Sequence, residues 1–457
     1  MKQRHVQHLF WRAGFGIRPK QLNTVSQKSK EQVVDMLFKA SSSATPLKVD
    51  TSEIDHFSTA YILKNKTQLP EFRKISREKL KTYNVAWVNR LVTSKETLRE
   101  KMTLFWANHF VCRDEHIYHV QQYNNTLRNH ALGHFGDFVK AISKEAAMLK
   151  FLNNKQNRKQ KPNENFAREL MELFTLGEGH YTEEDIKESA RAFTGYNNNF
   201  EGDFMLRRFH HDYDFKTFFG HSGRYDGDDI IDIILKQKQC ARFVCGKIYR
   251  YFVNDTINEK RVEELTNIFF EDYNIERLMR YLFMSDWFYE EANIGIKIKS
   301  PIEFLVGLRK TVPVTFKKEK DVFKIQKLLG QMLLNPPNVA GWKGGKSWID
   351  SNTLMLRLKL PSIILANAEI SLREKGEFED TFDKYRSNKK KNEFVSVEVD
   401  WETFNYQFKN VKVNDLKTLL IIPELSAGTE TYLQTLSQSS KQDYCVQLMS
   451  LPEYQMC

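Results

Sequence analysis

The sequence predicts a mainly α-helical protein, with a short β-hairpin or extended insertion near residues 195–220 and a small mixed segment at the C-terminus. Two observations support this fold class. Apolar residues recur at helical spacing over most of the 457 residues, most clearly over 84–112. The segment 195–220 replaces this spacing with Asn, Gly and aromatic residues, which favour turns and short strands.

The composition is that of an ordinary globular protein. Hydrophobic residues make up 41% and charged residues 28% of the chain. Aromatic residues reach 13%, which predicts a core packed largely by rings. The net charge of +11 allows acidic partners, but no nucleic-acid-binding motif accompanies it, so nucleic acid is not an expected partner.

The cysteines and the N-terminus indicate the compartment. The five cysteines form no CxxC pair, so neither a disulfide framework nor a structural zinc site is expected. The chain has no apolar run of about 18 residues, so no membrane span is expected. The first residues, MKQRHVQHLFWRAGFG, contain no apolar signal-peptide core. We expect a cytoplasmic protein; the alternative is export by a route that the sequence does not show.

Helical spacing predicts the elements of the first half in order. The stretch 1–16 is a short helix that ends at the turn Gly14-Phe15-Gly16, and 41–51 is a polar linker. One or two helices are expected over residues 21–40, and further helices over residues 68–81, 84–112, 119–131, 135–149, 163–176 and 182–193.

After the insertion at 195–220 the helical patterns resume. Helices are expected over residues 230–235, 239–253, 261–270, 275–284, 301–312, 322–334 and 348–368. The charged stretch 376–393 is expected to link a helical domain over 1–375 to a C-terminal α/β segment over 394–457, which could pack on the main domain. Within that segment, alternation at 394–399 and β-branched residues at 419–422 favour strands, and 429–448 favours a helix.

The stretch NENFARELMELFTLG, residues 163–177, is the helix around which the chain is organised. Its apolar residues share one face at about 100° per residue; they are Phe166, Leu170, Leu173 and Phe174. On the opposite face Glu164, Arg168 and Glu172 stack at intervals of four. One interpretation is a solvated ladder of ion pairs, worth tenths of a kcal/mol per pair. The other is a functional polar face.

This stretch also carries a family resemblance. Together with the following YTEEDIKESARAFTGY, it resembles the signature of a bacterial family catalogued as domain of unknown function number 1800. Further matches come in the family's order: HLFWRAGFG at 8–16, LREKMTLFWANHF at 98–110, HD and KTFFG within 211–220, DGDDIIDIIL at 226–235, SPIEF at 300–304 and PPNVAGWKGGKSW at 336–348. The resemblance covers roughly the first 370 residues. It implies no particular reaction, but it implies a sulfatase-like protein as a partner, because family members are frequently encoded beside one.

His109, in FWANHF, lies within an apolar helical stripe and is expected to be buried. Two interpretations stay open. The residue is a core histidine bonded to a carboxylate or carbonyl, or it is a metal ligand or general base that faces the carboxylates of the 163–177 helix. Asn108 beside it is a candidate to orient a substrate.

Glu169 and Glu172 form an ExxE pair on one flank of the 163–177 helix. Two such carboxylates can bind a hard divalent ion, or act as acid and base when their environments differ. No ExxH pair is present, which disfavours a di-iron bundle. Asn165 and Arg168 are candidate substrate-binding residues on the same polar side.

His211 and Asp212, with Lys216, lie in the irregular insertion, where loops often carry function. A His–Asp pair offers two metal ligands, or a base with the group that orients it, and Lys216 could hold an anionic group. The alternative is a hairpin held together by polar contacts.

Residues 340–347, AGWKGGKS, resemble a phosphate-binding P-loop but have Ala340 at the first glycine position, so ATP binding is rejected. A tight aromatic turn is expected, with Asn338 and Trp342 as candidate substrate-binding residues. His116 and His119 have the HxxH spacing of paired ligands. Because they lie outside the family matches, we expect them on the surface.

Three functions follow from these residues. The first is a helical hydrolase that acts on an anionic or polyol substrate through His109, Glu169, Glu172 and His211 in one cleft; whether it uses a divalent metal, held by Glu169, His211 and Asp212, is left open. The second is a non-catalytic scaffold or partner of a sulfatase-like protein, with the polar residues forming an internal network. The third is binding of an acidic polymer through the positive net charge.

Overall fold

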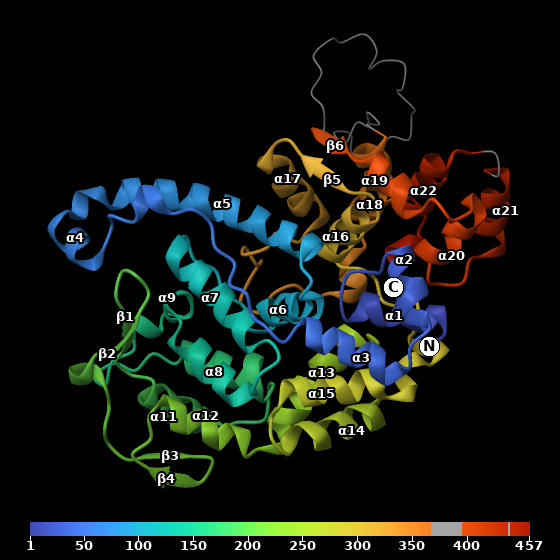
Figure 1. Ribbon diagram of the computed structural model, residues 1–457. Coiled ribbons are helices and arrows are strands. Elements are labelled where there is room, and N and C mark those ends of the chain that lie inside the picture. The colour runs from blue at the N-terminus through green and yellow to red at the C-terminus, as the bar shows by residue number, and fades with distance from the viewer. Residues whose placement is uncertain (367–394, 437–438) are drawn as a thin grey trace.

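The computed structural model describes residues 1–366, 395–436 and 439–457. It confirms the mainly α-helical prediction, because in these ranges the strands are limited to three small two-stranded antiparallel sheets (Figure 1). The predicted linker at 376–393 lies outside the described residues.

The first part of the chain is helical up to the insertion. Its helices are α1 (Gln3–Arg12), α2 (Pro19–Ser26), α3 (Lys30–Ala40), α4 (Thr59–Lys64), α5 (Leu69–Thr93), α6 (Thr97–His109), α7 (Ile117–His130), α8 (Phe135–Lys144), α9 (Ala146–Phe151), α10 (Asn165–Glu169) and α11 (Glu183–Ala192).

The helices resume after the insertion. They are α12 (Gly227–Leu235), α13 (Lys238–Phe252), α14 (Glu259–Phe270), α15 (Ile275–Met284), α16 (Pro301–Thr311), α17 (Glu319–Leu329), α18 (Ser351–Leu365), α19 (Trp401–Gln407), α20 (Leu416–Leu420), α21 (Ala427–Thr435) and α22 (Lys441–Met449).

The predicted insertion consists of two hairpins. Strand β1 (Tyr196–Asn198) pairs with β2 (Phe204–Leu206), and β3 (Lys216–Phe218) pairs with β4 (His221–Gly223). The second hairpin turns through Phe219 and Gly220, whose φ angles are 49° and 75°. Two positive φ angles are what a two-residue hairpin loop of the right twist requires.

The C-terminal segment differs in part from the prediction. The expected strand at 394–399 is present as β6 (Val397–Val399), which pairs with β5 (Val314–Phe316). The strand expected at 419–422 is wrong, because the chain is helical in α20 up to Leu420. The single helix expected over 429–448 is two helices, since the Ser440 hydroxyl caps a new start by accepting from the Asp443 amide.

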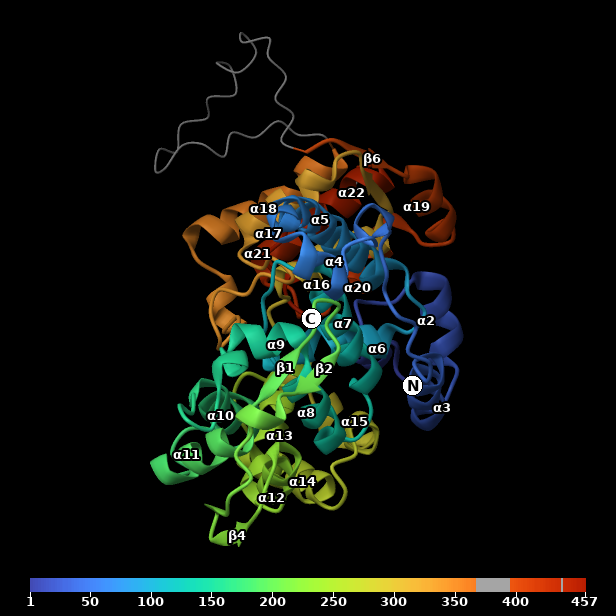
Figure 2. The same cartoon turned by 90° about the vertical axis from the view of Figure 1, so that its left-hand side faces the viewer.

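Two hydrophobic cores meet at α6. The first core joins helices α1–α3 and α6–α15, and the second joins α5 and α16–α18 to the C-terminal segment. In Figures 1 and 2 the C-terminal helices lie above α6, and helices α8 and α11–α15 lie below it. Phe105 of α6 belongs to the first core and the neighbouring Leu104 to the second. Helix α6 is therefore buried on more than one side, and its charged residues Arg99, Glu100 and Lys101 are buried as well.

No helix of the described ranges is both long enough and apolar enough to cross a lipid bilayer.

Candidate functional site

A cavity of about 480 Å³ lies at the C-terminal end of α6, where residues of both cores line it. Its wall is built from α6, the end of α13, the segment that leads into α16, and the glycine-rich loop 340–348. Its polar lining residues are Asn108, His109, Lys247, Arg250, Tyr251, Asp255, Lys297, Ser300, Glu303, Gln331, Lys343 and Lys346.

His109 lines this cavity and is only 3% exposed. Its Nε2 lies 2.9 Å from the carbonyl oxygen of Phe174, and its Nδ1 has no hydrogen-bond partner in the described part of the chain. A carbonyl can only accept, so Nε2 carries the proton and Nδ1 keeps its lone pair. Burial, and then the charge of Lys247, lower the pKa of His109 well below its ordinary value, so the ring is neutral at physiological pH.

The 163–177 helix contacts His109 through its backbone rather than through its carboxylates. The predicted single α-helix is α10 followed by a π-helix over Leu170–Thr175. The last carbonyls of a helix have no partner within it. Here the Leu173 carbonyl accepts from Lys247 Nζ at 2.7 Å, and the Phe174 carbonyl accepts from His109. Single π-turns are frequent at functional sites.

The glycine-rich loop is fixed to α6 by one side chain. Asn108 Oδ1 accepts from the Trp342 amide at 2.8 Å, and its Nδ2 donates to the Trp342 carbonyl at 2.9 Å. Gly341 has a φ of 74°, and a Cβ there would collide with the Asn108 side chain. Asn108 therefore positions the loop, whereas Asn338 caps the turn by accepting from the Ala340 amide at 3.0 Å and does not line the cavity.

The lining of the cavity carries an excess of positive charge. Five cationic side chains, Lys247, Arg250, Lys297, Lys343 and Lys346, face two carboxylates, those of Asp255 and Glu303. One of these carboxylates is already engaged, because Glu303 Oε1 accepts from both Lys297, at 2.6 Å, and the buried Lys101.

Burial raises the pKa of Glu303, but the two lysines outweigh this effect and hold the pKa well below its usual range. Burial lowers the pKa of Lys101 to about 8 in spite of the Glu303 charge. The Glu303 carboxylate is therefore shared by the ammonium groups of Lys101 and Lys297. It does not neutralise a further cation of the cavity.

More positive charge is buried behind the cavity. Arg12 is fully buried, donates from Nη2 to the Asn293 carbonyl, and leaves Nε and Nη1 without partners in the described residues. It lies within electrostatic reach of Cys457, Glu303 and Asp255. A buried charge costs several kcal/mol unless it is paired. The cavity and the residues behind it therefore suit an anion.

The remaining predicted residues of the 163–177 helix do not line this cavity. Arg168 pairs with Glu183, at 2.9 Å, and more weakly with Glu164. Glu172 accepts from the Tyr181 hydroxyl at 2.8 Å. Burial, and then the charge of Glu172, raise the pKa of Glu169. Asn165 is exposed.

His211, Asp212 and Lys216 are held by contacts within the insertion. His211 Nδ1 lies 2.8 Å from the Thr194 carbonyl, and Arg191 Nε donates to Asp212 at 2.8 Å. Lys216 Nζ donates to the carbonyl of Asp212 at 2.7 Å. His211 and Asp212 line a different cavity, of about 340 Å³.

The predicted metal set is therefore not assembled. Within residues 1–366, 395–436 and 439–457, no three His, Cys, Asp or Glu side chains are grouped so that they could hold a metal ion. Of the residues predicted for the site, Asn108, His109 and Trp342 line the same cavity, and the others lie elsewhere.

Sequence reasoning missed the charged residues of the site, above all Lys101, Lys247, Lys297 and Glu303. One signal was available: three consecutive charges, Arg99-Glu100-Lys101, interrupt an otherwise apolar family motif. Lys247 and Lys297 carry no comparable signal.

Comparison with known proteins places the chain in a family. No curated protein and no solved structure matches it. The family model described as "Protein of unknown function (DUF1800)" matches residues 8–456, which includes the C-terminal segment beyond the sequence motifs. The chain therefore belongs to the DUF1800 family of proteins of unknown function.

Proposed function

We propose that the protein is a hydrolase that acts on an anionic, hydroxyl-bearing small molecule bound in the cavity at the end of α6. One observation carries the proposal. A neutral His109, whose buried Nδ1 has no hydrogen-bond partner among the described residues, lines a cavity whose cationic side chains outnumber its carboxylates by five to two.

The cations of the cavity divide into two groups by exposure. Lys343 and Lys346 of the glycine-rich loop and Arg250 are exposed, and they attract an anion from solution. Lys247 and Lys297 lie deeper, where a lower effective dielectric strengthens their interaction with a bound anion. The anionic group of the substrate is therefore expected to bind between these two lysines.

His109 supplies the base in this proposal. Its Nε2–H bond to Phe174 fixes the tautomer and leaves Nδ1 as the proton acceptor. Nδ1 is buried, so a shift of the side chains around it admits a water molecule, and Nδ1 accepts the proton of that water as the water oxygen attacks the ester centre. The bond to the leaving oxygen then breaks, and the proton passes from Nδ1 to that oxygen. Lys247 and Lys297 stabilise the negative charge that develops in between. The step uses no metal held by Glu169, His211 and Asp212, which the structure does not group.

Binding and chemistry are tested separately. Inorganic phosphate and sulfate are titrated calorimetrically into the wild type, Lys247→Met and the control Lys238→Met, an exposed residue of the same helix that pairs with Glu263. We expect Lys247→Met to weaken binding at least about tenfold, in line with loss of a charge-assisted hydrogen bond, and the control to have no effect. Equal binding by all three proteins would contradict the proposed site.

Hydrolysis is tested with nitrophenyl phosphates, sulfates, carboxylate esters and acidic glycosides. His109→Gln, which retains a donor for the Phe174 carbonyl, is expected to lower turnover by about 10²- to 10⁴-fold while anion binding persists. Anion binding without hydrolysis of any ester would favour the non-catalytic role beside a sulfatase-like partner instead.

A further inference from the structure

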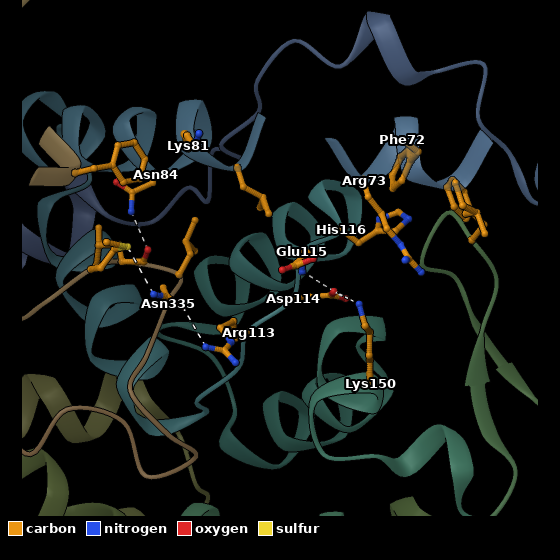
Figure 3. Close-up of a pocket in the computed structure, with 17 residues that line it drawn as sticks. Phe72, Arg73, Lys81, Asn84, Arg113, Asp114, Glu115, His116, Lys150 and Asn335 are labelled. Carbon is orange, nitrogen blue, oxygen red and sulfur yellow. Dashed lines mark hydrogen bonds and ion pairs between the residues drawn. The ribbon is translucent and has the colours of Figure 1, made fainter. Parts of the chain in front are cut away.

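A second and larger cavity, of about 760 Å³, lies between α5, the segment 113–116 after α6, the end of α9 and the segment 332–335 (Figure 3). It shares no lining residue with the cavity at the end of α6. Its apolar lining residues are Leu69, Phe72, Leu80, Phe200, Phe323, Met332, Leu333 and Leu334. The cavity is large enough for a small organic molecule.

Two positive side chains, those of Arg73 and Lys150, lie towards one end of this cavity. Figure 3 shows Arg73 and His116 beside Phe72, and Lys150 beside Asp114. Arg73 is exposed and makes no hydrogen bond or ion pair with the described residues. Lys150 pairs with Asp114.

The acidic residues of the lining are already engaged. Asp114 accepts from Lys150 and also from His119 Nδ1, at 3.0 Å. Glu115 pairs with Arg77, whose Nε lies 3.5 Å from its carboxylate. No carboxylate of the described lining pairs with Arg73, so its exposed guanidinium is available to an anion at this end of the cavity.

His116 adds a polar group without a partner to the same end. Its ring stacks on His119 with centroids 3.7 Å apart, and both of its ring nitrogens are buried without hydrogen-bond partners. The expectation that these two histidines lie on the surface is wrong for His119, which is only 6% exposed, whereas His116 is partly buried. Burial, and then the charge of His119, lower the pKa of His116 to about 3. At neutral pH His116 is therefore uncharged, and its two ring nitrogens are covered rather than open to the cavity.

We propose that this cavity binds an amphipathic carboxylate, a molecule with an apolar body and a single carboxylate group. Arg73, at the exposed rim of the cavity, pairs with the carboxylate in the fork geometry that guanidinium and carboxylate share. The apolar body lies along Leu80, Phe323 and Leu334. The backbone of Leu334 has a φ of 66°, which is unusual for a leucine, and such strain is often found where a chain lines a binding site.

The proposal is tested by calorimetric titration of the full chain with decanoate and with 2-naphthoate, which distinguish an alkyl from an aryl body. Decanol supplies the apolar body without the charge, and inorganic phosphate supplies charge without the body. We expect a carboxylate to bind at least about tenfold more tightly than decanol. Equal affinity for decanol, or no binding of either carboxylate, would overturn the proposal.

Point variants test where in the cavity the carboxylate group of the ligand binds. Arg73→Gln is expected to weaken carboxylate binding about tenfold or more. Lys74→Gln is the matched control, an exposed cation next to Arg73 on α5 and outside the cavity lining. Lys247→Met separates the two cavities, because it should leave this affinity unchanged. A loss in Lys74→Gln equal to that in Arg73→Gln would contradict the assignment, provided circular dichroism shows that the variants are folded.

Discussion

His109 Nε2 lies 2.9 Å from the carbonyl oxygen of Phe174, and this bond joins the end of α6 to the end of the π-helix at 170–175. Both segments belong to motifs that the sequence marks independently. The bond fixes which ring nitrogen carries the proton, and so it fixes which nitrogen is free. A backbone carbonyl, rather than a carboxylate, therefore selects the tautomer of His109, and burial keeps the ring neutral.

Two replacements of His109 test the contribution of its N–H donor to stability separately from that of its ring. In His109→Phe the Phe174 carbonyl stays buried without a donor, so we expect the free energy of unfolding to fall by about 1–3 kcal/mol. His109→Gln offers an N–H in place of Nε2 and should lose less. Urea denaturation of both variants measures the difference. Equal losses would mean that the hydrogen bond contributes little to stability.

The helical part of the fold follows from local patterns, and its departures have local causes. The spacing of Leu170, Leu173 and Phe174 fits an α-helix as well as a π-helix, so the sequence alone could not predict the π-turn. The helix predicted over 429–448 is interrupted because Ser440 and Asp443 form a start signal within an apolar pattern. The pairing of β5 with β6 joins residues far apart in the sequence, which no local pattern encodes.

The sequence predicts residues of the candidate site only where they lie in family motifs within apolar surroundings. Asn108, His109 and Trp342 line one cavity and were all named from the sequence. Lys247 was missed because a lysine in an amphipathic helix is usually solvated. Glu169 and His211 were named because polar residues in motifs often mark sites, but the same pattern also arises from residues that only stabilise a hairpin or a helix end.

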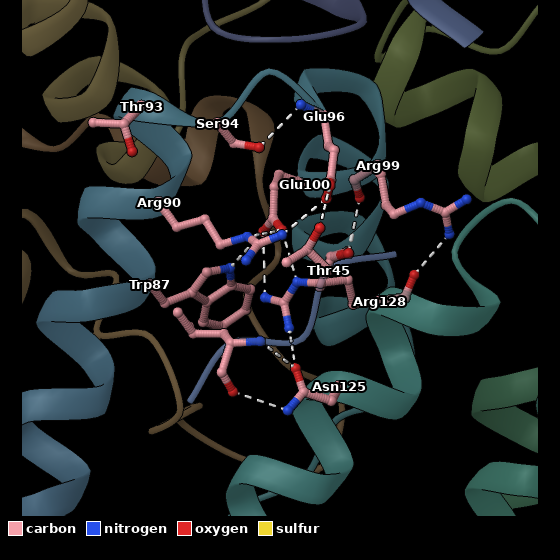
Figure 4. Close-up of polar contacts among 12 residues, drawn as sticks. Thr45, Trp87, Arg90, Thr93, Ser94, Glu96, Arg99, Glu100, Asn125 and Arg128 are labelled. Carbon is pink, nitrogen blue, oxygen red and sulfur yellow. Dashed lines mark hydrogen bonds and ion pairs between the residues drawn. The ribbon is translucent and has the colours of Figure 1, made fainter. Parts of the chain in front are cut away.

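Glu100 is the clearest case of a polar residue in a motif that serves the fold. Its carboxylate accepts from Arg90 and Arg128, both at 2.6 Å, and from Trp87 Nε1 at 3.2 Å (Figure 4). Glu100 and Arg128 are fully buried. Glu100→Gln leaves a buried guanidinium without its counter-charge, so we expect a loss of about 3–5 kcal/mol.

Chemical denaturation compares the stability of Glu100→Gln with that of a double variant. Because Glu100→Leu with Arg128→Met removes both buried charges, it should lose less than Glu100→Gln alone. Glu96→Gln is a milder control, since Glu96 lies at the edge of the same network and is 9% exposed. A Glu100→Gln protein as stable as the wild type would show that Arg128 finds another partner.

Lys299 should make stability depend on pH. The residue is fully buried, and burial lowers its pKa to about 7. In the unfolded chain the pKa is about 10.4. Below pH 7 both states are protonated and the cost of burying the charge is fully present. Between pH 7 and 10 the folded protein has lost a proton that the unfolded chain keeps, so its stability rises with pH.

The comparison with Lys299→Met isolates this effect from the other titrating groups. The stability of the wild type relative to the variant should rise from pH 7 to 9.5, by at most about 1.4 kcal/mol per pH unit. The same comparison with Lys238→Met, at an exposed position, should be flat. A difference that shrinks as pH rises would contradict the lowered pKa.

The variant Glu169→Gln tests whether the functional site extends to the 163–177 helix. Burial and the charge of Glu172 raise the pKa of Glu169, so the fold disfavours the charged carboxylate and Glu169→Gln removes that cost. We expect a change in stability within about 0.5 kcal/mol, with phosphate binding and ester hydrolysis retained, because the side chain does not line the cavity of His109. The measurement is a side-by-side assay with His109→Gln. If both variants lose hydrolysis equally, the carboxylate takes part in the chemistry, and the cavity at the end of α6 is only part of the active site.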